Sequence, residues 1–200
     1  MIDAQNCYRD ARRAFHQETD PSSFGQVDPW KLGQLVASRG AENDTKPREL
    51  EVVRYYTGMP SSAKQPKAYG AHLKQRAAHL ASGVEVRPRP LRYPADWPKL
   101  PAQEKGIDVA LAVDLVFGAA RRLYDVGVVV STDTDLVPAL EAVCELQRAW
   151  GTPTIEVVSW GPTRKRLRVD GYSVWCHWLD KDDYESVRDN SIYVSKEGRK

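Results

Sequence analysis

The sequence contains few cysteines and no long apolar run. Its three cysteines, Cys7, Cys144 and Cys176, are odd in number and widely spaced, which favours reduced thiols over a disulfide framework. No apolar stretch approaches the roughly 18 residues needed to span a bilayer, and the N-terminus lacks the charged-then-apolar pattern of a signal peptide. We therefore expect a cytoplasmic protein with no membrane partner.

Several common site motifs are also missing. The sequence has no glycine-rich phosphate loop, no internal repeat and no low-complexity tract, and its spacing gives no basis for Ser-His-Asp or His-Cys catalysis. Cys176 lies beside His177, but no second pair completes a metal site, so a buried thiol next to a surface histidine is the better interpretation. What remains is a chain of 200 residues, 42% hydrophobic and 28% charged, which suits one globular domain.

The net charge of +2 conceals an uneven distribution along the chain. Residues 61–106 hold nine Lys or Arg against three acidic residues, a net charge of +6. Residues 107–145 hold seven acidic residues against two arginines, a net charge of −5. Adjacent basic and acidic patches suit a metal-dependent enzyme that acts on a polyanion, although two ordinary solvated faces would give the same counts.

Hydrophobic periodicity and turn residues predict alternating strands and helices. A strand ends at residues 1–3, and a strand that starts at residue 84 soon meets prolines, which keep it out of a central ladder. The tail at 172–179 is either a last strand or a packed extension. The other predicted strands are 50–58, 126–131 and 154–160, and the predicted helices are 6–17, 28–38, 66–82, 107–125 and 135–150. This alternation predicts an α/β fold, a three-layer α/β/α sandwich around a mainly parallel central sheet.

Three aspartates stand where ligands bind in open parallel sheets, beyond the carboxyl ends of the strands. Asp3 ends the first strand, Asp133 ends the VVVS strand, and Asp108 opens the helix that leads into that strand. Helix capping would explain Asp108, and either Asp133 or Asp135. The strand-to-helix turn at Asp3 does not need two polar side chains, so capping does not explain the presence of both Asp3 and Asn6.

A further aspartate, Asp114, lies mid-helix among apolar residues, where a carboxylate is costly unless it is paired. It is six residues past Asp108 and so turned about 120° away, and we expect it to orient a neighbour rather than to touch the same ion. Carboxylates gathered in one crevice repel each other, and a divalent cation relieves that repulsion. Oxygen-only ligands suit Mg²⁺ or Mn²⁺, the cations that assist phosphodiester hydrolysis by activating water and stabilising the attacked phosphate.

Three segments carry a resemblance to a known family. IDAQN at 2–6, KGIDVALAVDLV at 105–116 and VVVSTDTDLVPAL at 128–140 closely resemble, in order and spacing, the signature blocks of the NYN domain, a branch of the PIN-like nucleases. The resemblance covers roughly residues 1–160 and extends weakly to about 180. It implies a PIN-like fold and a Mg²⁺- or Mn²⁺-dependent ribonuclease that acts on single-stranded or structured RNA.

The resemblance also implies roles for particular residues. The catalytic metal ligands that it implies are Asp3, Asp108 and Asp133. The residues that it implies support the site, through indirect or water-mediated contacts, are Asn6, Asp114 and Asp135. It predicts a nuclease domain over 1–180 and a partly disordered C-terminal extension over 181–200.

Two features depart from the family pattern. Only Met1 and Ile2 precede Asp3, so we expect either that the native reading frame starts upstream or that the first strand is unusually short. The proline-rich segment 86–104 is longer and more irregular than a plain connection, which makes it a candidate substrate-binding arm. The residues expected to contact the RNA backbone are Arg87, Arg89, Arg92, Lys99 and Lys105. Whether the chain forms a homodimer is left open.

The aromatic residues fall into two groups. Tyr93 and Trp97 lie in the basic proline-rich segment and are candidates for stacking on bases. The four tryptophans that flank or lie in apolar stretches are expected in the core, and these are Trp150, Trp160, Trp175 and Trp178.

Two other functions compete with the nuclease. DTDLV at 133–137 fits the nucleophile loop of a haloacid dehalogenase-type phosphatase, with Asp133 and Asp135, but that loop normally opens the fold and only 65 residues follow Asp135. They leave little room for the later lysine and acidic pair, although Asp182 and Asp183 exist. The other alternative is an inactive RNA-binding or scaffold module with the same fold. The full set of acidic residues argues against it, because an idle site has no reason to retain carboxylates that repel each other.

Overall fold

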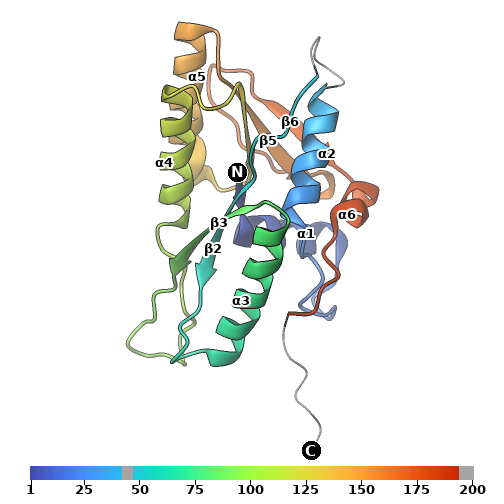
Figure 1. Ribbon diagram of the computed structural model, residues 1–200, viewed down its shortest axis with the longest axis vertical. Coiled ribbons are helices and arrows are strands. Elements are labelled where there is room, and N and C mark those ends of the chain that lie inside the picture. Colours follow the sequence, from blue (N-terminus) through green and yellow to red (C-terminus); the bar gives the residue numbers. More distant parts are fainter. Residues whose placement is uncertain (42–46, 194–200) are drawn as a thin grey trace, which may run out of the picture.

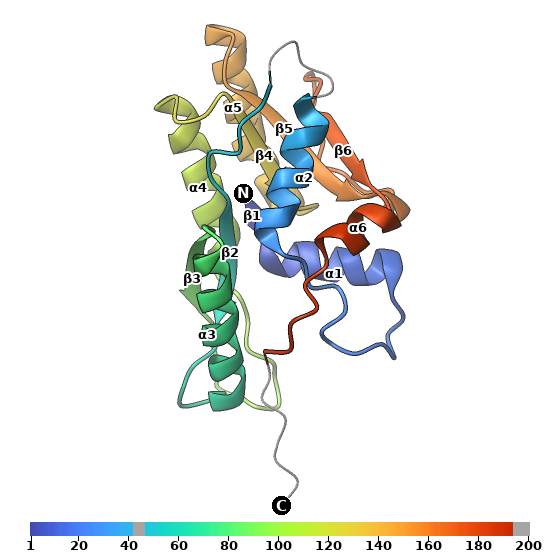
Figure 2. The ribbon, with the colours of Figure 1, turned by 45° about the vertical axis from the view of Figure 1, so that its right-hand side comes forward.

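The computed structural model describes residues 1–41 and 47–193. Its centre is a six-stranded sheet in the order β3-β2-β1-β4-β5-β6, in which every pairing is parallel (Figures 1 and 2). The strands are β1 (Ile2–Asp3), β2 (Arg54–Met59), β3 (Glu85–Pro90), β4 (Val126–Val130), β5 (Thr154–Trp160) and β6 (Trp175–Leu179). The helices are α1 (Ala4–Phe15), α2 (Pro29–Ala41), α3 (Pro66–Ala81), α4 (Ile107–Ala120), α5 (Val137–Trp150) and α6 (Lys181–Val187), with short 3₁₀ helices η1 (Thr134–Leu136) and η2 (Gly161–Thr163).

The strand order contains one reversal of direction. The chain starts at the centre with β1, moves outward through β2 and β3, and then returns to place β4, β5 and β6 on the other side of β1. Loops from adjacent β1 and β4 therefore leave the sheet in opposite directions, which opens a crevice beyond their carboxyl ends. The crevice is where an open parallel sheet binds ligands.

Helices cover both faces of the sheet (Figures 1 and 2). Leu111 of α4 and Leu140 of α5 lie in one buried cluster with Val129 of the sheet. Leu32 of α2 lies in a second buried cluster with Ile2 of β1 on the opposite face. The predicted three-layer α/β/α sandwich is therefore confirmed.

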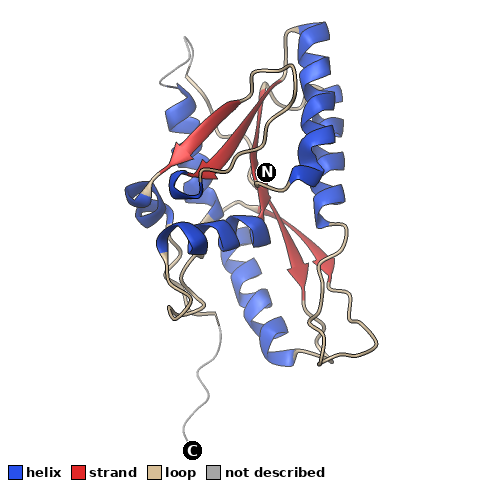
Figure 3. Ribbon diagram, turned by 180° about the vertical axis from the view of Figure 1, so that it is seen from behind, coloured by secondary structure: helices blue, strands red, loops and turns tan. Residues whose placement is uncertain are grey.

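Strand β3 lies at one edge of the sheet, as its prolines predicted. The backbone N–H of Glu85 donates to the carbonyl of Val53, just before β2, and that of Leu91 donates to the carbonyl of Met59, the last residue of β2. Because donors alternate along a strand, Pro88 and Pro90 occupy positions whose nitrogen points away from β2, where no N–H is needed. The twisted sheet is seen from behind in Figure 3, where β2 and β3 form a pair at one end.

Three elements differ in extent from the sequence prediction or choose between its alternatives. β1 has two residues, which is one of the two alternatives that the sequence left. The tail at 172–179 forms a true strand, β6. The helix predicted to reach residue 125 ends at Ala120, because Arg122 adopts a left-handed φ of +53° and turns the chain toward β4.

Two predictions about burial were wrong. Of the four tryptophans expected in the core, only Trp160 is buried, whereas Trp150, Trp175 and Trp178 are 44%, 55% and 42% exposed. Both β6 tryptophans lie on an edge strand, and Trp150 is the last residue of α5. His177 is buried rather than on the surface, because Glu156 of the neighbouring strand bonds its ring at 2.7 Å. The three cysteines are free thiols, as expected.

The segment after residue 180 contributes to the packed structure. Tyr184 and Val187 of α6 are buried in the cluster beneath α1 and α2. The Tyr184 hydroxyl accepts the backbone N–H of Gly25 at 2.8 Å and bonds the His16 ring, also at 2.8 Å. We expected the extension at 181–200 to be partly disordered. Of these residues, 194–200 lie outside the described part of the chain. Within that described part, no helix is both long and apolar enough to cross a membrane.

Candidate active site at the carboxyl edge of the sheet

The first helix begins with a polar face directed at the central crevice. Asp3 ends β1 and also caps α1, because its Oδ1 atom accepts the Asn6 backbone N–H at 3.1 Å. Asn6 and Asp10 follow at spacings of three and four residues, which place all three side chains on one side of the helix. This side of α1 meets the end of β4.

Three consecutive polar residues, Ser131 to Asp133, follow β4. The buried Ser131 hydroxyl donates to Asp3 Oδ2 at 3.3 Å and accepts the Asp133 backbone N–H at 3.1 Å. Ser131 therefore joins the two aspartates that end the two central strands.

A second link runs through Thr132. The Asn6 side-chain oxygen accepts the Thr132 backbone N–H at 2.8 Å and its hydroxyl at 3.2 Å. The same hydroxyl lies within hydrogen-bond distance of the buried Asp10 carboxylate. The start of α1 and the end of β4 are thus held together by side chains from both.

Asp3 is in an unfavourable place for a negative charge. Its side chain is buried, and burial raises the pKa of its carboxyl group because the charged form loses solvation. Hydrogen bonds from Asn6 and Ser131 act in the opposite direction, whereas the negative charge of Asp133 raises the pKa further. The two carboxylates are therefore close enough to repel each other.

Asp133 also caps the helical segment that follows it. Its Oδ1 atom accepts the Asp135 backbone N–H at 3.0 Å, which closes the first turn of η1. The Asp135 side chain is exposed. Asp133 therefore both caps η1 and interacts with the charge of Asp3.

Asp108 and Asp114 occupy different parts of α4. Gly106, with a φ of +73°, is the N-cap residue, and Asp108 is the second helical residue and makes no capping bond. Capping therefore does not explain Asp108. Asp114 accepts a hydrogen bond from the Tyr56 hydroxyl at 2.8 Å, and Tyr56 is the β2 partner of Asp3 in the sheet register. Asp114 thus holds the side chain of Tyr56, which lies beside Asp3 in the sheet.

Glu104 joins this region from the long loop between β3 and α4. Its Oε1 atom accepts the Gly58 backbone N–H at 2.9 Å at the end of β2. Burial raises the pKa of the Glu104 carboxyl group, and the charge of Asp3 raises it further. A Cβ atom at position 58 would lie 2.6 Å from Glu104 Oε1 and 2.5 Å from Leu91, so the close approach requires glycine there.

Comparison with known proteins gives a decisive match. A model of the NYN domain matches residues 1–169. The chain belongs to the NYN domain family. The family is generally one of nucleases with a PIN-like fold, which suggests a protein that acts on RNA.

A solved structure shares the fold of this NYN domain. It is the crystal structure of a protein of unknown function from Vibrio parahaemolyticus RIMD 2210633, with 17% sequence identity and a TM-score of 0.55. The alignment covers 90% of this chain and 91% of that one. No curated protein matches the chain.

The donor set of this NYN domain fits a divalent cation in chemistry. Asp3 and Asp133 offer carboxylates that repel each other, and the side chain that joins them, Ser131, is a hydroxyl. Such donors suit Mg²⁺ or Mn²⁺. Across residues 1–41 and 47–193, however, no group of three or more His, Cys, Asp or Glu side chains is gathered closely enough to hold a metal ion. The described structure therefore brings Asp3 and Asp133 together without completing a trio with Asp108.

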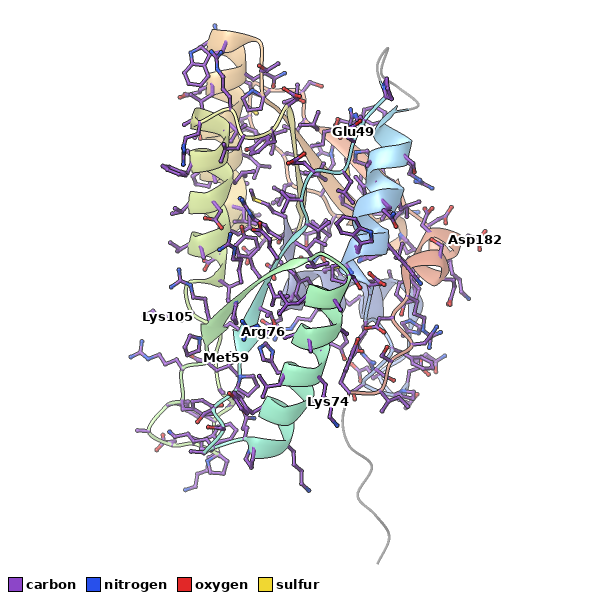
Figure 4. All side chains as sticks on the ribbon, viewed as in Figure 1. Glu49, Met59, Lys74, Arg76, Lys105 and Asp182 are labelled. Atoms are coloured by element: carbon purple, nitrogen blue, oxygen red, sulfur yellow. The ribbon has the colours of Figure 1, made fainter. Side chains whose placement is uncertain are left out.

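The predicted RNA-contacting residues lie on and after β3. Arg87 and Arg89 are exposed on the edge strand, and Arg87 pairs with Glu85 at 2.8 Å. Arg92 and Lys99 are exposed in the loop, which an isolated bridge from Arg92 to Gln103 closes at its base. Lys105 precedes α4 and lies with Met59 toward the end of the molecule where β2 and β3 finish (Figure 4).

The two stacking candidates pack against each other. The rings of Tyr93 and Trp97 meet edge to face with their centroids 5.0 Å apart. The Tyr93 hydroxyl donates to Gln65 and accepts the Ser61 backbone N–H, each at 2.8 Å. Tyr93 therefore anchors the loop to the start of α3.

The larger surface recess of this NYN domain does not coincide with the carboxylates. This recess, the larger of the two described here, has a volume of about 1010 Å³ and follows β6, and its lining includes Arg39, Trp175 and Trp178 but no acidic residue. We place the candidate site at the carboxyl edge instead, because the interacting acidic groups lie there. A smaller recess of about 320 Å³ lies beside them.

Sequence reasoning missed four polar residues of this region. Ser131 and Thr132 precede Asp133 directly, so the run STDTD was a usable signal for both. Asp10 was detectable from its helical spacing to Asn6. Glu104 had no sequence signal, because only the path of the long loop brings it to β2.

Proposed function

We propose that the protein is a metal-dependent ribonuclease that hydrolyses RNA phosphodiester bonds at the carboxyl edge of the sheet. The observation that supports this best is the meeting of Asp3 and Asp133 around Ser131, at the point where the strand order reverses. Two carboxylates that repel each other in a crevice are destabilising unless a cation or a proton neutralises them. Membership of a generally nucleolytic family agrees with the cation.

In this proposal Asp3 and Asp133 hold Mg²⁺ or Mn²⁺, and Asp108 approaches as the third ligand from the first turn of α4. When bound, the metal would lower the pKa of water and stabilise the negative charge that develops on the attacked phosphate. The protein groups keep the ligands in place. Asn6 fixes the loop that carries Asp133, and Asp114 fixes Tyr56 beside Asp3.

Asp135 has a separate role in the proposed site. Its backbone N–H donates a hydrogen bond to Asp133 Oδ1. The Oδ2 atom of Asp133 takes no part in this bond. The exposed Asp135 side chain adds negative charge at the mouth of the crevice. We propose that the Asp135 side chain orients a water molecule or a hydrated cation.

The proposed substrate is single-stranded or structured RNA. Its phosphates would be neutralised by the exposed cations on β3 and in the following loop, which are Arg87, Arg89, Arg92, Lys99 and Lys105. These cations and the carboxylates lie at the same end of the sheet, because β3, β2 and β1 are parallel.

The positions of Asp182 and Asp183 argue against the phosphatase alternative, which requires an acidic pair near Asp133. Asp183 completes the capping box of α6 with the N-cap residue Asp180, and it pairs with Arg39 at 2.6 Å. Asp182 lies on α6 at the opposite side of the view from α4 (Figure 4). Neither residue is therefore available to Asp133. An inactive RNA-binding module remains the alternative that an experiment must separate from the nuclease.

The test is replacement of Asp133 by Asn, measured by RNA digestion and by thermal melting with and without Mn²⁺. Asn caps a helix about as well as Asp, so Asp133→Asn removes only the charge. Cleavage of total RNA in Mn²⁺ should fall by orders of magnitude. Added Mn²⁺ should raise the melting temperature of the parent but not that of the variant.

Asp125→Asn is the matched control, because Asp125 is an exposed aspartate at the amino end of the same strand. It should keep full cleavage and the full Mn²⁺ shift. Full cleavage and an undiminished shift in Asp133→Asn would contradict the metal assignment. RNA binding without cleavage in the parent, with either metal, would favour the inactive module.

A further inference from the structure

The larger recess follows β6, which is the outer strand on the β4 side of the sheet (Figure 2). Its lining contains two tryptophans, Trp175 and Trp178, which are 55% and 42% exposed. Successive side chains of a strand point to opposite faces of the sheet, and Cys176 lies in the buried cluster beneath α4 and α5. Trp178 therefore points to the α5 face and Trp175 to the α2 face, so the recess borders both faces at this edge.

Trp178 lies level with the candidate active site. In the sheet register it pairs with Ser159 of β5, one residue beyond the level at which Val158 pairs with Val130. Ser131, which joins the two site aspartates, is likewise one residue beyond Val130. Two strand spacings, about 10 Å in all, therefore separate these levels of β6 and β4. Stacked nucleotides would span that distance in about three steps of 3.4 Å.

The crossover from β5 to β6 carries a cluster of cations. Residues 161–169 contain no acidic residue, and the four cations among them are Arg164, Lys165, Arg166 and Arg168. None of their side chains forms an ion pair with any residue that the structure describes. Arg166 lines the recess, and Arg164 and Lys165 are exposed directly after η2, at the carboxyl end of β5. A polyanion that leaves the carboxyl edge would therefore meet positive charge on its way to the recess.

Side-chain hydrogen bonds hold the start of this basic crossover beside β5. The Ser159 hydroxyl donates to the Lys165 carbonyl. The Thr163 hydroxyl donates to the Trp160 carbonyl at 2.8 Å and accepts the Lys165 backbone N–H at 3.3 Å. Because Ser159 is the register partner of Trp178, the cations are fixed near the level of that ring. The arrangement exists before any ligand arrives, which lowers the entropy lost on binding.

The recess favours a nucleic acid over an added β-strand. An added strand needs the outward backbone groups of β6, and the Trp178 carbonyl already accepts a hydrogen bond from Arg39 Nη1 at 3.2 Å. Arg39 also pairs with Asp183, so side chains of α2 and α6 cover this end of the edge. Exposed aromatic rings beside cations, in a lining without an acidic residue, are by contrast the features of a site for single-stranded nucleic acid.

We propose that the recess binds single-stranded RNA, in the segment that flanks the cleaved phosphate. The cations at 164–168 contact its phosphates, and unpaired bases stack on Trp178 and, beyond the edge, on Trp175. Every base has a face that can stack, so binding has little base preference, whereas bases inside a duplex do not reach the rings. The identification of this RNA as the substrate rests on the proposed function, but binding of the single strand does not.

The experiment titrates the full chain with oligoadenylate in a chelating buffer, where a metal-dependent nuclease does not cut. Binding is followed by the anisotropy of labelled RNA and by tryptophan fluorescence, which stacked bases should quench. The same oligoadenylate annealed to oligouridylate is the second probe. We expect the duplex to bind at least about fivefold more weakly, which corresponds to the loss of one stacked base.

Three variants test the aromatic part of the recess. Trp178→Leu should weaken binding of oligoadenylate at least about fivefold, whereas Trp178→Phe keeps a ring and should retain most of the affinity. Trp150→Leu is the matched control, because Trp150 is 44% exposed and lies beside Arg122 but outside the recess. It should leave the affinity unchanged. Melting curves verify that each variant is folded.

A further variant tests the cations. Joint replacement of Arg164, Lys165 and Arg166 by Gln should flatten the dependence of binding on salt, by about 0.7 in the logarithmic slope for each phosphate no longer neutralised. Arg121→Gln is the control, because Arg121 is exposed at the end of α4, before β4 begins. Its slope should equal that of the parent.

The outcomes separate this proposal from the nuclease. Equal affinity for single strand and duplex, or parental affinity in Trp178→Leu, would overturn the recess assignment. So would a Trp178→Leu variant that changes only the molecular mass in solution, because the recess would then join two copies of the chain. RNA cleavage together with either result would leave the nuclease standing without the recess.

Binding that is lost in Trp178→Leu, with no cleavage by the parent in either metal, would retain the recess and refute the nuclease. If both proposals hold, Trp178→Leu should raise the KM for single-stranded RNA at least about fivefold and leave kcat unchanged.

Discussion

The side-chain oxygen of Asn6 accepts the backbone N–H of Thr132 at 2.8 Å, although the two residues are 126 positions apart. The bond joins the first turns of α1 to the loop that carries Asp133. Since Asp3 caps the same helix, the distance between the two aspartates depends on this bond. Asn6 therefore positions the loop that carries Asp133 relative to Asp3.

Replacing Asn6 by Ala should affect both stability and cleavage. The Thr132 N–H would lose its partner, which costs about 1–3 kcal/mol when the group is shielded from water. Cleavage should fall about 10- to 100-fold, as is usual when a group that orients a metal ligand is removed. Melting curves and initial cleavage rates at several Mn²⁺ concentrations measure the two effects. Extra Mn²⁺ should partly restore the rate.

Asn190→Ala is the matched control, because Asn190 is exposed and lies after α6, next to Asp189, whose N–H bonds Gln26 rather than the loop after β4. It should leave the rate and its Mn²⁺ dependence unchanged. If Asn6→Ala lowers the melting temperature but keeps the parental rate, Asn6 contributes to stability alone.

Asp3→Asn should stabilise the metal-free protein while abolishing cleavage. Asn retains the capping bond to Asn6 and removes a buried charge that Asp133 repels. We expect a gain of about 1 kcal/mol, or about 2–4 °C in melting temperature for a domain of this size. The comparison is made in a chelating buffer, with Asp125→Asn as the reference. A lower melting temperature would mean that the Asp3 carboxylate stabilises the fold, against the argument from repulsion.

Glu156 should make stability depend on acid pH. Burial acts to raise the pKa of its carboxyl group, but hydrogen bonds from His177 and the two-point contact with Arg48 lower it to about 2. A depressed pKa contributes stability that is present above the unfolded value of 4.5 and is lost as the pH falls toward 2. The difference in unfolding free energy between the parent and Glu156→Gln should be about 3 kcal/mol at neutral pH.

That difference should shrink progressively between pH 4.5 and 2, as measured by denaturant unfolding at each pH. Glu145→Gln, at an exposed position on α5, is the control and should show only a small difference. A constant difference for Glu156→Gln across the acid range would show that packing, not charge, stabilises this cluster.

The basic residues should act on RNA binding through phosphate charge. Replacing Arg87, Arg89, Arg92 and Lys99 by Ala should weaken binding of unrelated RNAs to a similar degree and flatten its salt dependence. For single-stranded RNA, the slope should fall by about 0.7 for each phosphate that the variant no longer neutralises. Arg89→Ala alone should have a larger effect than Arg87→Ala, because Glu85 already neutralises Arg87 in part. Arg148→Ala on α5 is the control, and an unchanged slope in the fourfold variant would place the RNA elsewhere.

The positions of the two central aspartates could be predicted because strand ends obey a simple rule. A buried strand followed at once by aspartates places them at the carboxyl edge, and parallel strands share that edge. This reasoning led to Asp3 and Asp133, and the structure shows their charges interacting. It did not lead to Glu104, whose position depends on how a long proline-rich loop folds back onto β2.

Burial near the sheet edge was harder to predict, because apolar runs do not reveal strand order. The run at 172–179 predicted either a last strand or a packed extension, and nothing in it showed that β6 would be outermost. Trp175 and Trp178 are exposed for that reason, and His177 is buried because its partner Glu156 lies on the next strand inward.

The family match ends at residue 169, yet the sheet ends at β6 and the core at α6. A protein shortened to the matched range would lose β6 and leave β5 as an outer strand. Six of the seven residues of β5 are buried, and the strand contains no proline, in contrast with β3 at the other edge. An exposed, apolar, unpaired strand is a template on which other chains assemble. The segment after residue 169 therefore covers the edge of β5, and we expect a fragment that ends at the family boundary to form insoluble material.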